Sequence, residues 1–304
     1  MTATVIVGGK YQMITRREVL MMGGLTAAAL GVGRPAAAEK EPEAVLKISS
    51  QEGIIPGADL PEKLAKMEKW GIEGLEVGGG GLPGRVAQIK AALANSNVKI
   101  SAICAGFQGA LISSDESERA KCRSSMKEIL AAAGELGSTG LIFVPAFNHQ
   151  NPLPFVEARK ALIDQLSELA EHAAKCGTRL LMEPLNRNEA WFLRLLADAA
   201  SICRDVNHPG ACMMGDFYHM YIEETSDMGA FLSAGKYLHH VHLASRTRKL
   251  PGQDDRDFTD GFRGLKMIGY RDYCSFECGV LGDREVEIPK SVKFLQEQWR
   301  KARI

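Results

Sequence analysis

FVEARKALIDQLSELAEHAAK at residues 155–175, followed after three residues by RLLME at 179–183, is the stretch that decides the fold. Its first part carries apolar residues at three- and four-residue spacing, namely Ala161, Leu162, Leu166, Leu169, Ala170 and Ala173. This spacing predicts a helix with one buried face. The second part is short and mostly apolar, which is typical of a parallel strand covered on both faces. The two parts together predict one helix–strand unit.

The same unit recurs along the chain from Leu46 onward. Short apolar runs rich in Val, Ile, Leu and Met alternate with amphipathic stretches. The expected strands are Leu46–Ser50, Gly74–Val77, Lys99–Cys104, Gly140–Val144, Arg179–Glu183, Ala211–Asp216, Leu238–His242 and Tyr273–Glu277. The expected helices lie near residues 60–70, 84–95, 115–136, 155–175, 192–204, 226–235, 258–268 and 286–302.

Eight strand–helix units in about 260 residues are typical of a single (β/α)8 TIM barrel and fit it better than an open doubly wound sheet. No Pro/Ser-rich or highly charged linker interrupts the repeat, so a second domain is not needed. We therefore expect a one-domain α/β barrel over residues 39–304.

Residues 1–38 differ in character from the rest of the chain. Paired Arg16 and Arg17 precede a weakly apolar run from Val19 to Val32, and the segment closes on Ala36-Ala-Ala before charged residues. A basic start, a short apolar middle and an Ala-x-Ala end predict a cleavable export signal of the twin-arginine type, and thus a periplasmic protein. Met13 stands where such a signal would start. The run is too short and too rich in Gly and Ala to predict a stable membrane span.

The charge balance supports this division. The chain has 37 basic and 37 acidic side chains, but four basic residues and one acidic residue fall in the first 38 positions. The remaining chain is mildly acidic, which argues against a partner with a phosphate backbone, so we expect no nucleic acid. The seven cysteines are scattered without CxxC spacing, and no disulfide framework or zinc ribbon is indicated.

Four consecutive expected strands end in a potential metal ligand. These residues are Glu183, Asp216, His242 and Glu277. Functional groups of a TIM barrel lie at the carboxyl ends of its strands, so we expect the four side chains to point into one mouth. Three buried carboxylates would repel one another without a cation. An oxygen-rich set with one histidine favours a single divalent ion, Mn²⁺ first, with Mg²⁺ or Co²⁺ as alternatives.

Other polar residues follow the same strand ends. Glu189 comes six residues after Glu183, His219 three after Asp216, and Arg248 six after His242. Such side chains can hold several hydroxyl groups, so they are candidate substrate contacts. His149, after the fourth strand, lies at the same rim; it is either a further contact or an exposed loop residue.

These motifs resemble the xylose-isomerase-like barrel superfamily, and among its members the ketose (tagatose/psicose) 3-epimerases. The matching stretches are EPLNRNE at 183–189, DFYHMYIEE at 216–224, His242 with Arg248 before Pro-Gly, and SFE at 275–277. The resemblance implies metal ligation by the same four residues and substrate contacts by Glu189, His219 and Arg248. Cys104 aligns more loosely with a pocket cysteine on the third strand.

The superfamily also includes apurinic endonucleases with three metals, which carry additional histidines after the second and third strands. Here those strands end in Val77-Gly-Gly and Cys104-Ala-Gly, so the additional ligands are missing. A DNA-repair function is therefore not expected.

The resulting hypothesis is a sugar epimerase that transfers a proton next to a carbonyl through an enediolate, with Glu183 and Glu277 as the two catalytic carboxylates. C3 epimerisation of a free ketose stands first. Aldose–ketose isomerisation and the cleavage or dehydration of a keto-glycoside or inosose remain open, because all use the same proton removal. A noncatalytic metal- or sugar-binding barrel is the alternative of another class. The expected partner is a small sugar or keto-sugar, and homo-oligomerisation stays open.

Overall fold

The computed structural model describes residues 2–7, 10–15, 43–150 and 153–304. The chain divides into two units, Met1–Pro42 and Glu43–Ile304. In the first unit, strands β1 (Thr2–Val7) and β2 (Lys10–Thr15) pair antiparallel, with Thr2 opposite Thr15. The expected arginine pair, apolar run and Ala-x-Ala end of the export signal lie outside the described residues, so the signal stays a prediction.

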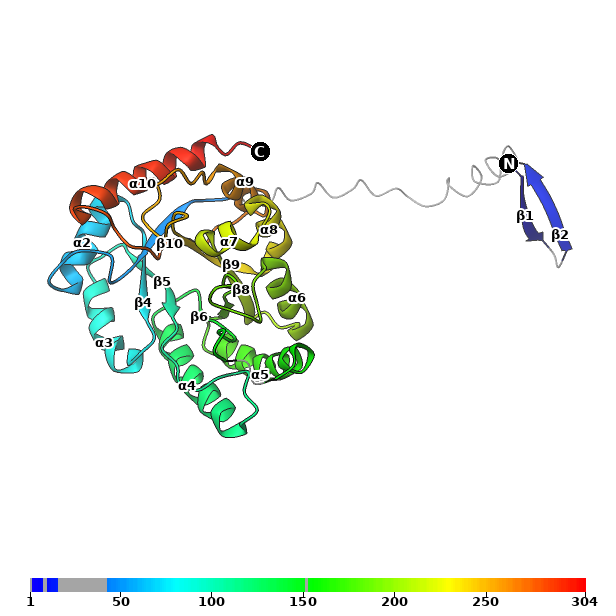
Figure 1. Ribbon diagram of the computed structural model, residues 1–304, viewed down its shortest axis with the longest axis horizontal. Helices are drawn as coiled ribbons and strands as arrows, with labels where there is room; N and C mark the ends of the chain where they lie inside the picture. The colour runs from blue at the N-terminus through cyan, green and yellow to red at the C-terminus, as the bar shows by residue number, and fades with distance from the viewer. Residues whose placement is uncertain (1, 8–9, 16–42, 151–152) are drawn as a thin grey trace. The chain divides into compact units, whose positions relative to one another are not determined.

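The second unit is a closed barrel of eight parallel strands in the order β10-β3-β4-β5-β6-β7-β8-β9, with helices around it (Figure 1). The strands are β3 (Lys47–Gln51), β4 (Gly74–Gly78), β5 (Lys99–Cys104), β6 (Leu141–Phe143), β7 (Leu180–Met182), β8 (Ala211–Asp216), β9 (Leu238–Leu243) and β10 (Tyr273–Phe276). The predicted single (β/α)8 barrel is confirmed, and each expected strand end lies within one residue of the observed one.

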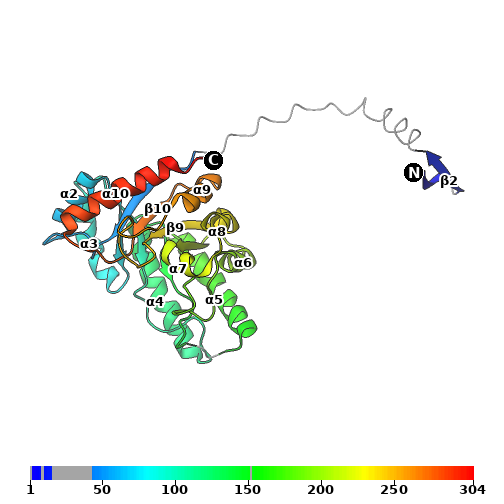
Figure 2. The same cartoon turned by 45° about the horizontal axis from the view of Figure 1, so that its top comes forward.

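The helices follow the strands in alternation. They are α2 (Leu60–Trp70), α3 (Leu82–Leu93), α4 (Glu116–Glu135), α5 (Phe155–Lys175), α6 (Leu196–Val206), α7 (Phe217–Glu223), α8 (Asp227–Ala234), α9 (Thr259–Met267) and α10 (Arg284–Lys301), with a 3₁₀ turn η1 (Gly235–Tyr237) before β9. Helix α6 begins four residues later than expected, and α7 and η1 were not expected. Helix α7 packs against β8 and β9, as Figures 1 and 2 show.

The barrel interior holds both apolar and polar side chains. A small buried cluster fills part of it and consists of Ala102, Ile142, Leu181, Cys212 and Met214. These residues alternate along their strands with those that pack against the helices, so they face inward. Glu76, His240 and Ser275 are also buried, and Ser49 Oγ lies 2.6 Å from Ser101 Oγ. Buried polar groups usually have hydrogen-bond partners, as Ser49 and Ser101 have in each other.

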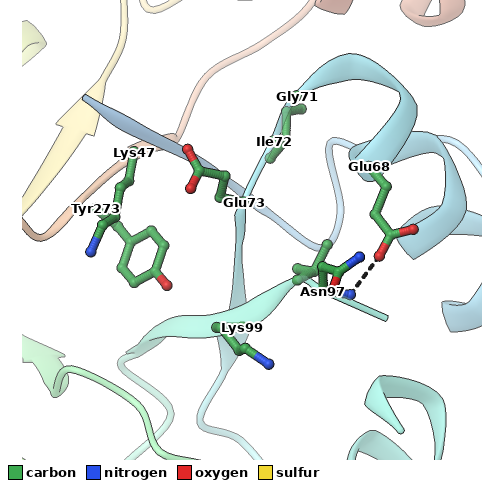
Figure 3. A pocket seen from close by; sticks show the side chains of 9 residues that line it. Lys47, Glu68, Gly71, Ile72, Glu73, Asn97, Lys99 and Tyr273 are labelled. Atoms are coloured by element: carbon green, nitrogen blue, oxygen red, sulfur yellow. Dashed lines mark hydrogen bonds between the residues drawn. The ribbon is translucent and has the colours of Figure 1, made fainter. Parts of the chain in front are cut away.

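The two ends of the barrel differ. Lys47, Lys99 and Tyr273 begin their strands, and together with Glu73 they line a hollow of about 300 Å³ at the amino ends (Figure 3). In TIM barrels the catalytic and binding residues lie at the opposite end, where the strands finish. All seven cysteines lie in the described part of the chain and are free thiols. Among the described residues, no helix is both long enough and apolar enough to cross a membrane.

Candidate active site

Four side chains from four adjacent strands meet at the carboxyl end of the barrel. Asp216 ends β8 and His242 lies in β9, while Glu183 and Glu277 directly follow β7 and β10. One ligand atom from each lies within 4.8 Å of the others. The structure thus brings together the four residues that the strand ends indicate.

Asp216 has two roles because its two oxygens face different groups. Its Oδ1 caps α7 by accepting a hydrogen bond of 2.7 Å from the Tyr218 backbone N–H. Its Oδ2 faces the site, 3.9 Å from His242 Nδ1 and 3.6 Å from His219 Nε2. The helix cap therefore fixes the rotation of the carboxylate and presents the second oxygen to the mouth.

The imidazole of His242 is central to the cluster. Its Nδ1 lies 3.1 Å from Glu277 Oε2 and 3.6 Å from Glu183 Oε1. Within the described chain, His242 Nδ1 and Glu183 Oε1 are buried and, despite these short ion-pair distances, neither makes a hydrogen bond of normal geometry. A buried polar atom without a partner costs free energy, and two of them aimed at one point indicate a ligand between them.

The donor set fits a divalent cation. Burial raises the pKa of Asp216 to about 8 and also raises the pKa of Glu183, because neighbouring charges do not compensate fully for the loss of water. Three carboxylate oxygens and one imidazole nitrogen are ligands that suit Mn²⁺, Mg²⁺ or Co²⁺. A cation would favour the charged form of each carboxylate and give the two unpartnered atoms a ligand.

Arg248 closes one side of the cluster. Its Nη1 donates to Asp216 Oδ2 at 3.3 Å, its Nη2 donates to Glu277 Oε2, and its guanidinium lies 4.8 Å from the centre of the Tyr218 ring. Burial would raise the pKa of Glu277, but the charges of His242 and Arg248 outweigh it and lower the pKa to about 2. Glu277 is therefore ionised at neutral pH and available as a base.

His219 and Glu189 lie beside the cluster. The Asn186 backbone N–H donates to His219 Nδ1 at 3.2 Å, and the Asn186 side-chain amide donates to Glu189 Oε1 at 2.9 Å. Burial and the nearby Arg248 charge lower the pKa of His219 to about 3, so its ring is neutral. Its Nε2 lies 3.0 Å from Arg248 Nη1, a group that can only donate, and 3.6 Å from Asp216 Oδ2, so His219 connects the loop after β7 to the arginine beside the cluster.

The remaining candidates differ in position. Cys104 ends β5 and lines a cavity of about 460 Å³ at the mouth, together with Gln51, Glu76 and Gly78. His149 is exposed on the loop after β6, where its ring stacks on Phe147 with 5.8 Å between centroids. The structure therefore places Cys104 beside the cluster and does not bring His149 to it. The role of His149 as a substrate contact stays a prediction.

Sequence reasoning missed two site residues. Glu76 lies in the middle of β4 and is 1% exposed, with Oε2 at 2.9 Å from His240 Nε2 and at 3.0 Å from His242 Nε2. Gln51, the last residue of β3, donates to Glu76 Oε1 and to Glu277 Oε1. The available signal was Glu76 itself, a carboxylate inside an apolar strand. Burying a charge costs free energy, so such a residue indicates a buried partner.

Comparison with known proteins identifies the family. A family model described as "Xylose isomerase-like TIM barrel" matches residues 64–298. The chain belongs to the xylose isomerase-like TIM barrel family. The expected resemblance is thereby confirmed over most of the barrel.

Several relatives are named sugar epimerases. The chain is 29% identical over 240 residues to 3-dehydro-D-guloside 4-epimerase of Escherichia coli, covering 76% of this chain and 92% of that protein. It is 31% identical over 150 residues to L-ribulose 3-epimerase of Methylomonas sp., covering 49% of this chain and 52% of that protein. The crystal structure of 3-keto-D-glucoside 4-epimerase from E. coli superimposes with a TM-score of 0.78 at 27% identity, over 83% of this chain and all of that chain. The expectation of a sugar isomerase of the epimerase type is confirmed at the level of the family.

Proposed function

We propose that this protein is a divalent-metal-dependent epimerase that inverts a carbon next to the keto group of a sugar. The observation that carries the proposal is the position of two carboxylates at one cation site. Glu183 and Glu277 follow β7 and β10, and Asp216 and His242 reach the same point from the two strands between them. Epimerisation requires one proton-transfer group on each face of the inverted carbon, and these two carboxylates are our candidates for that pair.

In the proposed reaction one carboxylate removes the proton from the carbon beside the carbonyl, and the other returns a proton to the opposite face. A bound divalent ion, for which we propose Mn²⁺, would supply positive charge next to the carbonyl oxygen and so ease removal of the proton. Arg248 can donate to sugar oxygens, and His219 beside it is a further contact, so together they would hold the sugar between the two carboxylates. Glu189, in the loop after β7, and Cys104, at the end of β5, are further candidate contacts to the sugar.

Two substrates are favoured by different observations. A free ketose, inverted at C3, fits the motifs shared with ketose 3-epimerases. A keto-glycoside, inverted at C4, is favoured by the match to nearly the full length of the E. coli guloside epimerase. It is also favoured by the cavity of about 460 Å³ at the mouth, which Gly53 and Gly78 line without side chains of their own. An aglycone could occupy that space. Isomerisation and lyase chemistry remain alternatives at the same site.

We also propose that the protein is exported to the periplasm by a twin-arginine signal over residues 1–38, with translation starting at Met1 or Met13. Mass spectrometry of the protein from the periplasmic fraction tests this. A mature chain that begins near Glu39 supports the proposal, and an intact N-terminus in the cytoplasmic fraction contradicts it.

Deuterium exchange tests the reaction. The Mn²⁺-loaded protein is incubated in D₂O with a set of ketoses and 3-keto-glycosides, and the recovered sugars are analysed by NMR. Deuterium at C3 of a ketose supports the first substrate, and deuterium at C4 of a 3-keto-glycoside supports the second. Label at C1 or C2 indicates isomerisation, and loss of the aglycone indicates a lyase. Absence of label and of product from every sugar would contradict the proposal.

A further inference from the structure

Glu76 is a fully buried carboxylate that the proposed reaction does not use. Its Oε2 accepts from His240 Nε2 at 2.9 Å and from His242 Nε2 at 3.0 Å, and its Oε1 accepts from Gln51 Nε2 at 2.9 Å. Three donors on one carboxylate compensate for the loss of water and keep it charged. Glu76 therefore has a fixed orientation behind the cluster.

The orientation of Glu76 determines which nitrogen of His242 can bind a cation. Because Nε2 donates to Glu76, Nδ1 is the nitrogen that faces Glu183, Asp216 and Glu277, and a cation bound there would take the place of a proton on Nδ1. A carboxylate that accepts from the far nitrogen of a ligating histidine fixes the tautomer and the ring position, and it makes the near nitrogen a stronger ligand.

Gln51 connects the same carboxylate to the catalytic one. Its Nε2 lies 2.9 Å from Glu76 Oε1 and 3.0 Å from Glu277 Oε1, so one NH₂ group donates both of its hydrogens to carboxylates. An amide oxygen at this place would face two negative oxygens, which fixes the assignment of the amide. Glu277 Oε1 is thereby occupied, and Oε2 is the oxygen turned toward His242 Nδ1 and Arg248.

We propose that Gln51 and Glu76 are positioning residues of the active site, with Glu76 holding His242 as a metal ligand and Gln51 holding Glu277 in its reactive orientation. This inference rests on the proposed function, since it concerns the same site. Neither residue needs to touch the cation. Gln51 also lines the mouth cavity, so the same side chain contacts both that cavity and the metal ligand Glu277.

The test uses two variants of nearly unchanged shape, Glu76→Gln and Gln51→Leu, in the full-length protein. Calorimetric titration with Mn²⁺ is expected to give an affinity about 10–100-fold lower for Glu76→Gln. Gln51→Leu is expected to lose about 10–100-fold in kcat while KM changes by only a few fold, because a misplaced catalytic group lowers rate more than binding. Crystal structures of both variants are expected to show a rotated His242 ring or Glu277 carboxylate.

Ser49→Ala is the matched control, because Ser49 lies on β3 two residues before Gln51 and faces the same interior, where it pairs with Ser101. It is expected to keep Mn²⁺ affinity and kcat. If Gln51→Leu fails to fold, Gln51→Met replaces it, since it keeps the chain length and lacks the donor.

The outcomes separate the two proposals. Variants that bind Mn²⁺ and turn over sugar like the wild type, with His242 and Glu277 unmoved, would overturn the positioning roles while the proposed function stands. Equal losses in Ser49→Ala would overturn them as well. The wild type could bind Mn²⁺, and the variants could show weaker Mn²⁺ binding and displaced His242 or Glu277 side chains, while no sugar is epimerised. In that case the positioning roles stand and the proposed function fails.

Discussion

At the scale of single residues, removal of either catalytic carboxylate, Glu183 after β7 or Glu277 after β10, should block proton transfer on a different face of the sugar. We expect Glu183→Gln and Glu277→Gln each to lower epimerisation by about 10²–10⁴-fold, because each removes one proton-transfer group. Each variant that retains metal should still exchange the proton of one epimer with D₂O, since the remaining carboxylate serves one face. Metal content and exchange of both epimers are measured by mass spectrometry and NMR.

Glu52→Gln is the control for these variants. Glu52 also lines the mouth cavity, but its carboxylate is held by Arg85 at 2.9 Å and lies outside the four-ligand cluster. It is expected to retain activity within a few fold. Full epimerisation by Glu277→Gln would show the two-carboxylate mechanism to be wrong.

The sequence predicts the residues whose position follows from the fold alone. Glu183, Asp216, His242 and Glu277 end successive strands, and any barrel brings such ends together. Glu76 and Gln51 could not be placed in the same way. Their roles depend on which side chains meet across the barrel, since the contact between Glu76 and His242 joins strands that are distant in sequence. A carboxylate within an apolar strand predicts only that a buried partner exists.

At the scale of elements, the position of Asp216 depends on helix α7, which it caps. The packing of α7 in turn depends on a glycine of α9, Gly261. Phe217 packs among Phe231, Phe258 and Phe262, and a Cβ at Gly261 would lie 2.4 Å from the Phe217 ring. The ring is fully buried and cannot move aside. We expect Gly261→Ala to destabilise the fold by about 1–3 kcal/mol and to weaken Mn²⁺ binding, as measured by thermal melts and titration.

Gly84→Ala is the matched substitution in a helix. Gly84 is exposed in α3, and a Cβ there would have no atom within 4 Å. Without a clash, the gain in helix propensity should raise stability by up to about 1 kcal/mol. Destabilisation of both variants to the same extent would show that the contact with Phe217 is not the cause.

The elements that sequence periodicity missed are the shortest ones. Helix α7 has seven residues, which is too short for a helical repeat of apolar positions to be recognised. The helix starts at its cap, Asp216. Because Asp216 was predicted as a metal ligand, its second role as a helix cap was not recognised in the sequence. Helix α6 begins at Leu196, and its N-cap residue, Leu195, offers no side-chain hydrogen bond that would mark the start. Because the residues just before it are also apolar, the predicted helix began too early, at residue 192.

At the scale of the whole molecule, the cation should stabilise the fold. An ion that binds only the folded state adds about 2.7 kcal/mol at one hundred times its Kd. For a barrel of this size that corresponds to roughly 5 °C in Tm. We expect Mn²⁺ to raise the Tm of the wild type and EDTA to reverse the change. Asp216→Asn should show little shift, although the amide oxygen can still cap α7. An equal shift in that variant would place the ion elsewhere.

Stability should also depend on pH through a contact at the amino ends of β9 and β10. His239 Nδ1 lies 2.7 Å from Asp272 Oδ2. Burial alone would lower the pKa of His239, but the hydrogen bond to Asp272 and the Cys212 thiol raise it to about 9. The folded state thus holds a proton that the unfolded chain releases near pH 6.5. The resulting stabilisation is complete below about pH 6.5 and is lost as pH rises through about 9.

The variant His239→Gln isolates this contribution, because other titrating groups affect both proteins equally. We expect the variant to be less stable than the wild type by on the order of 1–2 kcal/mol at pH 6, by less at pH 8, and by almost nothing at pH 10. Thermal or urea unfolding at constant ionic strength measures the difference. A difference that stays constant over this range would mean that His239 acts by packing, since packing does not titrate and the ion pair with Asp272 does.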